Sequence, residues 1–220
     1  QRLTSPQQLA YAPAWSPNGT YLIYHGLMAG SIGSANRDLL YLRVPTGPVD
    51  ISKISSTPFI ETAAFREMMP QFSPDGRYVA YASDISGRFE VYIRSFPDGL
   101  DKWPVSINGG HYPKWNPAGN ALFFVSGISI GSRNLNTLMA VSVEMNEGLE
   151  IGILQKLFSA GQVGADFLAG EGGVNTLYEP SSDGSGLWSS RIWMTESVSP
   201  PSPSSRTGSR NSKVHSEYPH

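Results

Sequence analysis

Apolar and polar residues alternate over short stretches of this chain, and turn residues separate one stretch from the next. In residues 89–94 (FEVYIR) every second residue is apolar, which is the period of a half-buried β-strand. Residues 78–82 (YVAYA) contain aromatic and β-branched side chains, which strands favour. No stretch shows a helical period bounded by capping residues. The pattern therefore predicts an all-β chain.

The expected strands fall into groups of four. The central group has residues 78–82, 89–94 and 103–107 and a strand that leads to Trp115. The first repeat offers strands at 21–24, 39–44 and 51–54, and the third at 121–125, 138–143 and, more loosely, 149–157. Repeats of this kind are typical of β-propeller blades.

A short motif recurs along the chain, at 14–24 (AWSPNGTYLIY), 71–81 (QFSPDGRYVAY), 114–124 (KWNPAGNALFF) and, in a worn copy, 178–184 (YEPSSDG). Ser16, Ser73, Asn116 and Ser181 occupy the same place in these copies and are 57, 43 and 65 residues apart. Propeller blades repeat every ~40–50 residues, so two of the intervals contain insertions.

The motif predicts a hairpin corner and not a reaction centre. Its serine caps the turn, its proline presets φ, its Asp or Asn tolerates the bridge region, and its glycine takes a positive φ. The residue before the serine position is aromatic in the three clear copies. The structural residues of the motif are Trp15, Ser16, Pro17, Gly19, Phe72, Ser73, Pro74, Asp75, Gly76, Trp115, Pro117, Gly119, Asp183 and Gly184.

Residues 72–81 (FSPDGRYVAY) resemble the WD40-like, TolB-type propeller repeat. The longer block that contains 69–72 (MPQF), 90–93 (EVYI), 102–106 (KWPVS), 109–110 (GG) and 113–115 (PKW) resembles the propeller found C-terminal to the kinase domain of some bacterial serine/threonine protein kinases. The resemblance covers most of residues 11–184 and is strongest over 68–143. It implies a partial β-propeller of about three to four four-stranded blades. Related blades also occur in TolB and in prolyl-oligopeptidase-type peptidases, so the parent protein stays open.

The chain changes character after residue 184. Eleven of the 36 residues in 185–220 are serine, and neither alternation nor a helical period is present. We divide the chain into a propeller segment, 1–184, and a Ser/Pro-rich disordered tail, 185–220. A second hypothesis is that the reading frame is lost in this part of the chain. When residues 201–208 are back-translated and each codon is started one base earlier, the shifted codons permit a strand with alternating aliphatic residues. The nucleotide sequence would decide between these two hypotheses.

Composition narrows the classes of function. The 220 residues include 23 Gly and 17 Pro, only 15% are charged, and the formal net charge is -2. A helical bundle would have fewer Gly and Pro, and a nucleic-acid-binding protein would show clustered basic charge. The absence of cysteine excludes disulfides, Cys-ligated metals and thiol catalysis. No apolar run reaches the ~20 residues of a membrane span, and the piece has the character of an internal or processed segment.

Candidate chemistry is sparse. Gly127, Ser129 and Gly131 match G-x-S-x-G after a strand, but a loop and not a helix follows, and no suitable histidine lies downstream. His25 and His111 have no metal-ligand spacing, and Asp75, Asp84, Asp98 and Asp101 fit turn chemistry better than a calcium loop. Residues 30–34 (GSIGS) lack the Lys-Ser/Thr of a phosphate loop. We therefore expect no enzymatic activity, no metal and no cofactor.

The remaining candidates are surface residues. By analogy with propellers, the first strand of each blade lines the central channel, and the loops that lead into it contact ligands. This selects Arg66, Glu67, Met68 and Met69 before blade two, and His111, Tyr112 and Lys114 before blade three. Ordinary packing and solvated loops are the alternative.

Three functions follow from these expectations. The first is a non-catalytic sensor or binding segment for a protein or peptide, with a kinase domain in the same chain and a location outside the cytoplasm. The second is the substrate-gating propeller of a prolyl-oligopeptidase-type peptidase. The third is a free-standing TolB-like protein. We expect no nucleic-acid partner and no membrane span in this segment.

Overall fold

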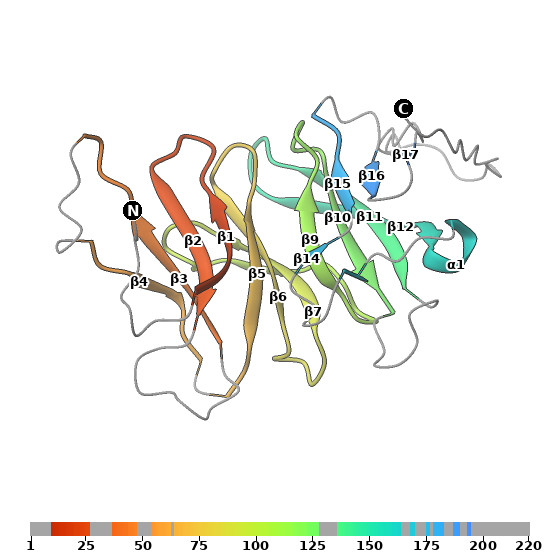
Figure 1. Cartoon of the computed structure of the whole chain (residues 1–220), viewed down its shortest axis with the longest axis horizontal. Helices are drawn as coiled ribbons and strands as arrows, with labels where there is room; N and C mark the ends of the chain where they lie inside the picture. Colours follow the sequence, from red (N-terminus) through yellow and green to blue (C-terminus); the bar gives the residue numbers. More distant parts are fainter. Residues whose placement is uncertain are drawn as a thin grey trace. The chain divides into compact units, whose positions relative to one another are not determined.

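The computed structural model describes residues 10–26, 37–47, 54–62, 64–127, 136–163, 168–169, 175–176, 178–182, 187–189 and 193–194. In this part of the chain the protein is built almost wholly of β-strands (Figure 1). The strands are β1 (Ala10–Trp15), β2 (Tyr21–Gly26), β3 (Asp38–Arg43), β4 (Thr57–Ile60), β5 (Glu67–Phe72), β6 (Tyr78–Ser83), β7 (Glu90–Ser95), β8 (Lys102–Pro104), β9 (His111–Trp115), β10 (Ala121–Ser126), β11 (Thr137–Glu144), β12 (Glu150–Ser159), β13 (Leu168–Ala169), β14 (Asn175–Thr176), β15 (Tyr178–Pro180), β16 (Leu187–Ser189) and β17 (Trp193–Met194).

The strands form three antiparallel sheets of four, in the orders β1-β2-β3-β4, β5-β6-β7-β8 and β9-β10-β11-β12. We call these sheets blades one, two and three. The expected all-β fold of four-stranded propeller blades is thereby confirmed. The chain divides into two compact units, Gln1–Pro113 and Lys114–His220, which are described separately. No described helix is long and apolar enough to cross a membrane.

The hairpin corners have the predicted geometry. In blade two, the backbone N–H of Tyr78 donates to Oγ of Ser73 over 3.0 Å, and Oγ of Ser73 donates to the Asp75 carboxylate over 2.6 Å. The N–H of Gly76 donates to the carbonyl oxygen of Ser73 over 2.9 Å, and Gly76 has a φ of 74°. Ser16, Asn18 and Tyr21 repeat the arrangement in blade one.

The third corner closes in a different way. Asn116 stands at the serine position, and its Oδ1 accepts from the N–H of Ala118 over 3.0 Å. The N–H of Gly119 donates to the carbonyl oxygen of Asn116 over 2.8 Å, and Gly119 has a φ of 75°. The backbone turn is therefore kept although the side chain that caps it differs.

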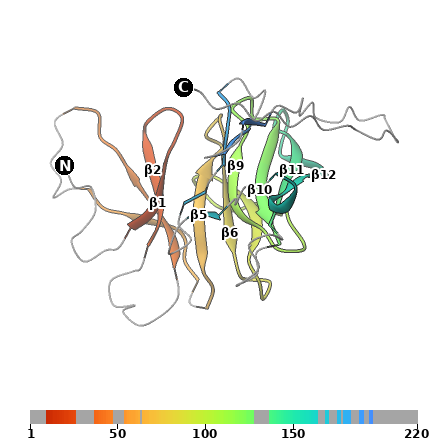
Figure 2. The ribbon, with the colours of Figure 1, turned by 45° about the vertical axis from the view of Figure 1, so that its right-hand side comes forward.

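Blades one and two pack through an aromatic core within the first unit. Strand β5 lies against β1, β2 and β3 (Figure 2). Its Phe72 is 8% exposed and meets the ring of Phe96 edge-on, with ring centroids 4.9 Å apart. Phe96 in turn contacts Tyr21, Tyr41 and Phe59 of blade one. Aromatic rings of one blade therefore fill the face of the next.

The first strand of each blade carries an irregularity that the sequence analysis did not anticipate. Ala12, Met69 and Tyr112 have φ values of 47°, 58° and 56°, and each stands directly before a proline. The pairing register shifts at this place in β1 and in β5. A β-bulge admits a proline, which has no N–H to donate, and re-aims the neighbouring groups. The cost of a left-handed backbone at these residues is about 1–3 kcal/mol each.

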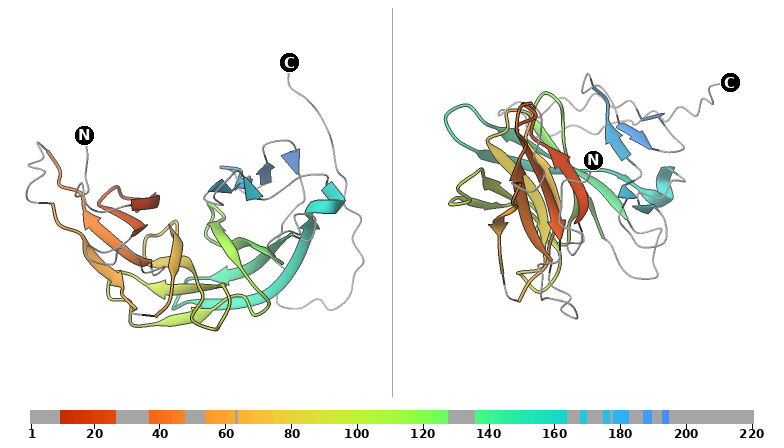
Figure 3. Two further views of the ribbon diagram at one scale, coloured as in Figure 1. Left: turned by 60° about the horizontal axis from the view of Figure 1, so that its bottom comes forward. Right: turned by 60° about the vertical axis from the view of Figure 1, so that its left-hand side comes forward.

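Several expected boundaries were wrong. The fourth strand of blade one is β4, whereas we expected a strand at 51–54. Residue 54 is outside any strand, and 51–53 lie outside the described residues, so for them the expectation stays a prediction. Strand β8 ends at Pro104, although we expected the strand to reach residue 107. Strand β12 continues to Ser159 and leads into one helical turn, α1 (Ala160–Val163) (Figure 3).

The worn fourth copy of the motif continues further than its sequence indicated. Strand β15 pairs with β16, and β16 pairs with β17, in a three-stranded antiparallel sheet. Tyr178 in β15 is 1% exposed. Strands β16 and β17 fall within 185–220, the range that we expected to be disordered, whereas Asp183 and Gly184 lie outside the described residues. The boundary at residue 184 stays a prediction.

Candidate functional site

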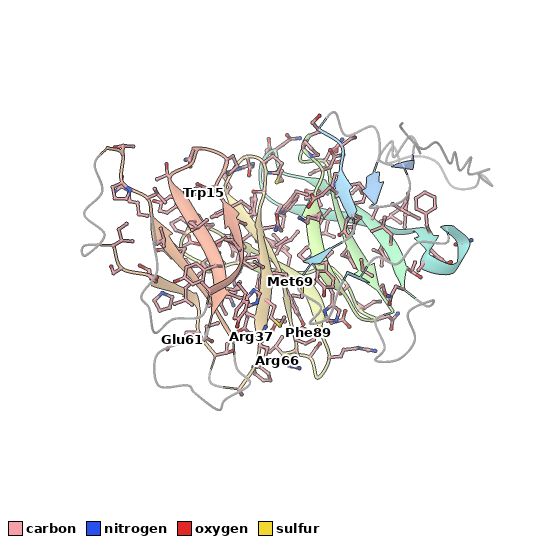
Figure 4. All side chains as sticks on the ribbon, in the orientation of Figure 1. Trp15, Arg37, Glu61, Arg66, Met69 and Phe89 are labelled. Atoms are coloured by element: carbon pink, nitrogen blue, oxygen red, sulfur yellow. The ribbon has the colours of Figure 1, made fainter. Side chains whose placement is uncertain are left out.

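One end of blades one and two brings together a group of aromatic, histidine and arginine side chains of the first unit. At this end β1, β3, β5 and β7 begin and β2 and β6 end. We call it the arginine–aromatic end and define it by Tyr11, His25, Arg37, Arg66 and Phe89. The opposite end carries the Ser-Pro-Asp-Gly turns and is called the corner end. Figure 4 shows Arg37, Arg66 and Phe89 near one another, with Trp15 far from them.

The first group at this end consists of Tyr11, His25 and Arg37. The rings of Tyr11 and His25 are stacked, with centroids 5.6 Å apart and planes 19° from parallel. The guanidinium of Arg37 lies over the Tyr11 ring at 5.2 Å from its centroid. Its Nη1 is 3.5 Å from Nε2 of His25. A cation over an aromatic face is held in place by the ring quadrupole.

His25 is fully buried and electrically neutral at physiological pH. Burial, and secondly the charge of Arg37, lower the pKa of His25 to about 4. Its Nδ1 accepts a hydrogen bond from the backbone N–H of Met69 over 3.3 Å. In a neutral imidazole, an accepting Nδ1 places the proton on Nε2. His25 therefore presents an N–H toward Arg37.

The second group consists of Arg66, Phe89 and His111, with Asp84 beside them. The guanidinium of Arg66 lies over the Phe89 ring at 4.7 Å, and the rings of Phe89 and His111 have centroids 4.8 Å apart. Arg66 also donates to Asp84 through Nε over 2.7 Å and through its backbone N–H over 2.7 Å. Burial and the charge of Arg66 lower the pKa of His111 to about 4. An arginine, an aromatic ring and a neutral histidine thus occur together twice at this end.

Two buried carboxylates lie behind these groups. Glu67 is 1% exposed and accepts from Oγ1 of Thr62 over 3.0 Å and from Oγ of Ser83 over 3.1 Å. Asp38 accepts from the backbone N–H of Thr62 over 3.1 Å. Burial raises the pKa of Glu67 and that of Asp38. Both carboxylates hold blade one to the start of β5, and neither is free to meet a ligand.

A third carboxylate stabilises the loop before β9. Glu90 accepts from Oγ of Ser106 and from the backbone N–H of Gly109, at 2.9 Å for Oε1. A Cβ on Gly110 would lie 2.5 Å from Oγ of Ser106, so this position requires glycine. The loop is therefore fixed where it delivers His111 to the ring of Phe89.

The residues selected from the sequence fall into different surroundings. Arg66 and His111 are brought together around Phe89, and this pair supports the candidate end. Glu67 is buried, and so is Tyr112 at 6% exposed. Lys114 belongs to the second unit, where its Nζ is 2.6 Å from Oε1 of Glu179. Tyr11, Arg37 and Phe89 were not predicted as site residues, because their roles depend on strands far apart in the chain.

The other candidates from the sequence have local explanations. Asp75 holds the corner of blade two, Asp98 accepts from Oγ of Ser95 over 2.7 Å, and Asp84 pairs with Arg66. Among the described residues no group of three or more His, Cys, Asp or Glu could hold a metal ion. The segments that contain Ser129 and residues 30–34 lie outside the described residues.

The second unit has a pocket with a volume of about 270 Å³ at the turn between β11 and β12. It is lined by Glu144, Asn146, Glu147, Gly148 and Glu150. This acidic turn contributes no aromatic ring and no cation to its lining. The arginine–aromatic end has both, and it is the better candidate for recognition of a partner.

Comparisons with known proteins identify the fold. No family model matches the chain, and no curated protein matches it. TolB from Acinetobacter baumannii matches with a TM-score of 0.57 and 16% identity over 88% of this chain and 41% of that one. A chain of the nidogen/laminin complex matches with a TM-score of 0.53 and 11% identity, over 86% of this chain and 58% of that chain.

A puromycin hydrolase matches with a TM-score of 0.52 and 14% identity, over 85% of this chain and 25% of that chain. The chain thus spans between a quarter and three fifths of the length of these proteins. At such identities the likeness concerns the fold, which is that of a TolB-like β-propeller.

Proposed function

We propose that this chain is a non-catalytic β-propeller segment that binds a protein or peptide through the arginine–aromatic end of blades one and two. The observation that carries the proposal is the double occurrence of an arginine, an aromatic ring and a neutral histidine at one end of the first unit. Arginine and aromatic side chains are enriched where proteins bind partners. Here the rings also hold the guanidinium groups in place before a ligand arrives.

The surroundings of the two histidines support a binding role over catalysis. His25 accepts a hydrogen bond from the backbone N–H of Met69 and lies beside Arg37, and neither of these residues is a nucleophile. A pKa near 4 makes His25 and His111 weak bases at neutral pH. Each imidazole also packs against an aromatic ring, His25 stacked on Tyr11 and His111 tilted by 48° against Phe89, which suits a rigid platform for a ligand better than proton transfer.

For the parent protein, we propose a receptor-like serine/threonine kinase whose propeller senses a ligand. The support is the resemblance of residues 68–143 to kinase-linked propellers. A substrate-gating propeller of a serine peptidase is the second candidate, because puromycin hydrolase shares the fold. A free-standing TolB-like protein is the third. A kinase domain upstream in the full open reading frame would support the first proposal, and an α/β-hydrolase domain downstream would support the second.

Selection of random peptides displayed on phage tests the binding role. Peptides that enrich on the protein are synthesised, and their affinities are measured for wild type, Tyr11→Ser, Phe89→Ser and Trp15→Ala. Trp15 is the matched control, because it lies on the same strand as Tyr11 but at the corner end, and it is 53% exposed. We expect the two first variants to weaken binding and Trp15→Ala to leave it unchanged. Peptides that bind all four proteins equally would contradict the proposed site.

A further inference from the structure

Arg37 and Arg66 lie close together on neighbouring stretches of backbone. The N–H of Glu67, the residue directly after Arg66, donates to the carbonyl oxygen of Arg37 over 2.7 Å. Arg37 leads into β3 of blade one and Arg66 leads into β5 of blade two. Each blade therefore contributes one cation to the same end (Figure 4).

Each arginine is held in place and keeps donors available. Tyr11 supports one guanidinium and Phe89 the other. The guanidinium of Arg66 meets Asp84 through Nε alone, and no described residue accepts from its two terminal nitrogens. Arg37 has no carboxylate partner among the described residues. A planar guanidinium with a free edge binds a carboxylate through two parallel hydrogen bonds.

The contact between Arg37 and His25 favours an oxygen acceptor. Because Nδ1 of His25 accepts from Met69, its Nε2 carries the proton and faces Nη1 of Arg37 at 3.5 Å. Both atoms are then donors, and two donors cannot satisfy one another. Since Arg37 is only half-buried, a carboxylate from outside can meet the donors that Arg37 turns to the surface.

The acidic residues near Arg37 and Arg66 do not remove the preference of these arginines for a carboxylate ligand. Asp84 uses both of its oxygens on Arg66. Asp38 and Glu67 are buried and bonded to Thr62, and burial raises the pKa of each. Glu61 is exposed at this end (Figure 4), where its negative charge repels an anionic ligand. Its removal should therefore strengthen the binding of an acidic ligand.

We propose that Arg37 and Arg66 recognise carboxylate groups, so that the ligand of this end is an acidic peptide segment. The inference rests on the proposed binding function and specifies its partner. The two arginines are spaced across adjacent blades, so they would take carboxylates from successive parts of one extended segment. Binding of this kind weakens as ionic strength rises, because salt screens exposed charges.

Fluorescence anisotropy with a labelled peptide of alternating Glu and Gly, amidated at its C-terminus, tests the proposal. We expect Arg37→Gln and Arg66→Gln each to weaken binding by about tenfold, the usual effect of losing one charge-assisted hydrogen bond. Arg43→Gln is the matched control, because Arg43 is an exposed arginine of β3 at the corner end. Glu61→Gln should tighten binding. Circular dichroism of every variant establishes that it is folded.

Two further probes separate the sources of the carboxylate and the two proposals. A peptide of alternating Gln and Gly with a free C-terminus binds if the terminal carboxylate is the ligand, and the amidated form does not bind in either case. Equal affinity for the amidated Glu peptide and the amidated Gln peptide, or insensitivity to both arginine substitutions, would overturn carboxylate recognition. If carboxylate recognition fails in this way but phage-selected peptides still lose affinity on Tyr11→Ser, the proposed binding function stands while the acidic ligand does not.

Discussion

The backbone N–H of Met69 in blade two donates a hydrogen bond to Nδ1 of His25 in blade one. Met69 stands at the β-bulge of β5 with a φ of 58°, and the bulge turns its N–H away from the ladder of its own sheet. His25 is the fully buried acceptor that this N–H needs. A strained backbone position in one blade is thereby tied to a neutral imidazole in the next.

The free energy of unfolding should fall when the pH is lowered from about 6.5 to about 4. An unfolded histidine binds a proton near pH 6.5, whereas the pKa of His25 and that of His111 are lowered to about 4 in the folded protein. Between these two pH values the unfolded chain binds more protons than the folded protein. The contribution of the neutral histidines to the free energy of unfolding is therefore complete above pH 6.5 and is lost as the pH falls toward 4. Asp38 and Glu67 act in the opposite direction, since burial raises their pKa values.

The comparison of wild type with His25→Gln isolates the histidine. Urea unfolding at several pH values between 4 and 7 gives the dependence for each protein. Gln keeps an acceptor for Met69 but does not titrate, so we expect the difference in stability between the two proteins to shrink by up to about 3 kcal/mol on acidification. A difference that stays constant over this range would show that folding does not lower the pKa of His25.

Phe72→Ala should destabilise the protein by about 3–5 kcal/mol, the usual cost of removing a buried ring. Phe72 is 8% exposed and packs on Phe96 in the core between blades one and two. Trp15 occupies the same place in the repeat but is 53% exposed, so Trp15→Ala should change stability little. Chemical denaturation of both variants provides the measurement. Similar losses in the two would contradict the packing of β5 against blade one.

The corners were predictable because all of their contacts are local. Ser73, Asp75, Gly76 and Tyr78 lie within six residues, and the geometry of the turn follows from the chemistry of these residue types. The repetition of this motif then gave the number of strands in each blade. Insertions and bulges have no comparable sequence motif, so the position of β4 further along the chain than 51–54 was not predicted.

The candidate site was only partly predictable. Arg66 and His111 were selected by analogy with the loops of propellers, but Phe89, which joins them, was predicted only as the first residue of the strand 89–94. Tyr11 and Arg37 meet because β1, β2 and β3 pair in one register, which the alternation of residues alone does not give. A bulge before each proline shifts this register further.

Gly76→Val should destabilise blade two through its backbone. A Cβ at Gly76 would meet only Cδ of Pro17, at 3.5 Å, so space is not the obstacle. The obstacle is the φ of 74°, which costs a residue with a side chain about 1–2 kcal/mol and a β-branched one more. Asn tolerates this region, so Gly76→Asn is the matched variant and should lose less stability than Gly76→Val.

Thermal unfolding followed by circular dichroism ranks wild type, Gly76→Asn and Gly76→Val. The expected order follows from conformation and not from volume, since Asn and Val are both larger than Gly and meet the same open space. If Asn and Val destabilise the protein equally, the left-handed turn is not what glycine provides at this corner. Gly19, with a φ of 69° and nothing within 4 Å of its Cβ position, allows the same pair of substitutions in blade one.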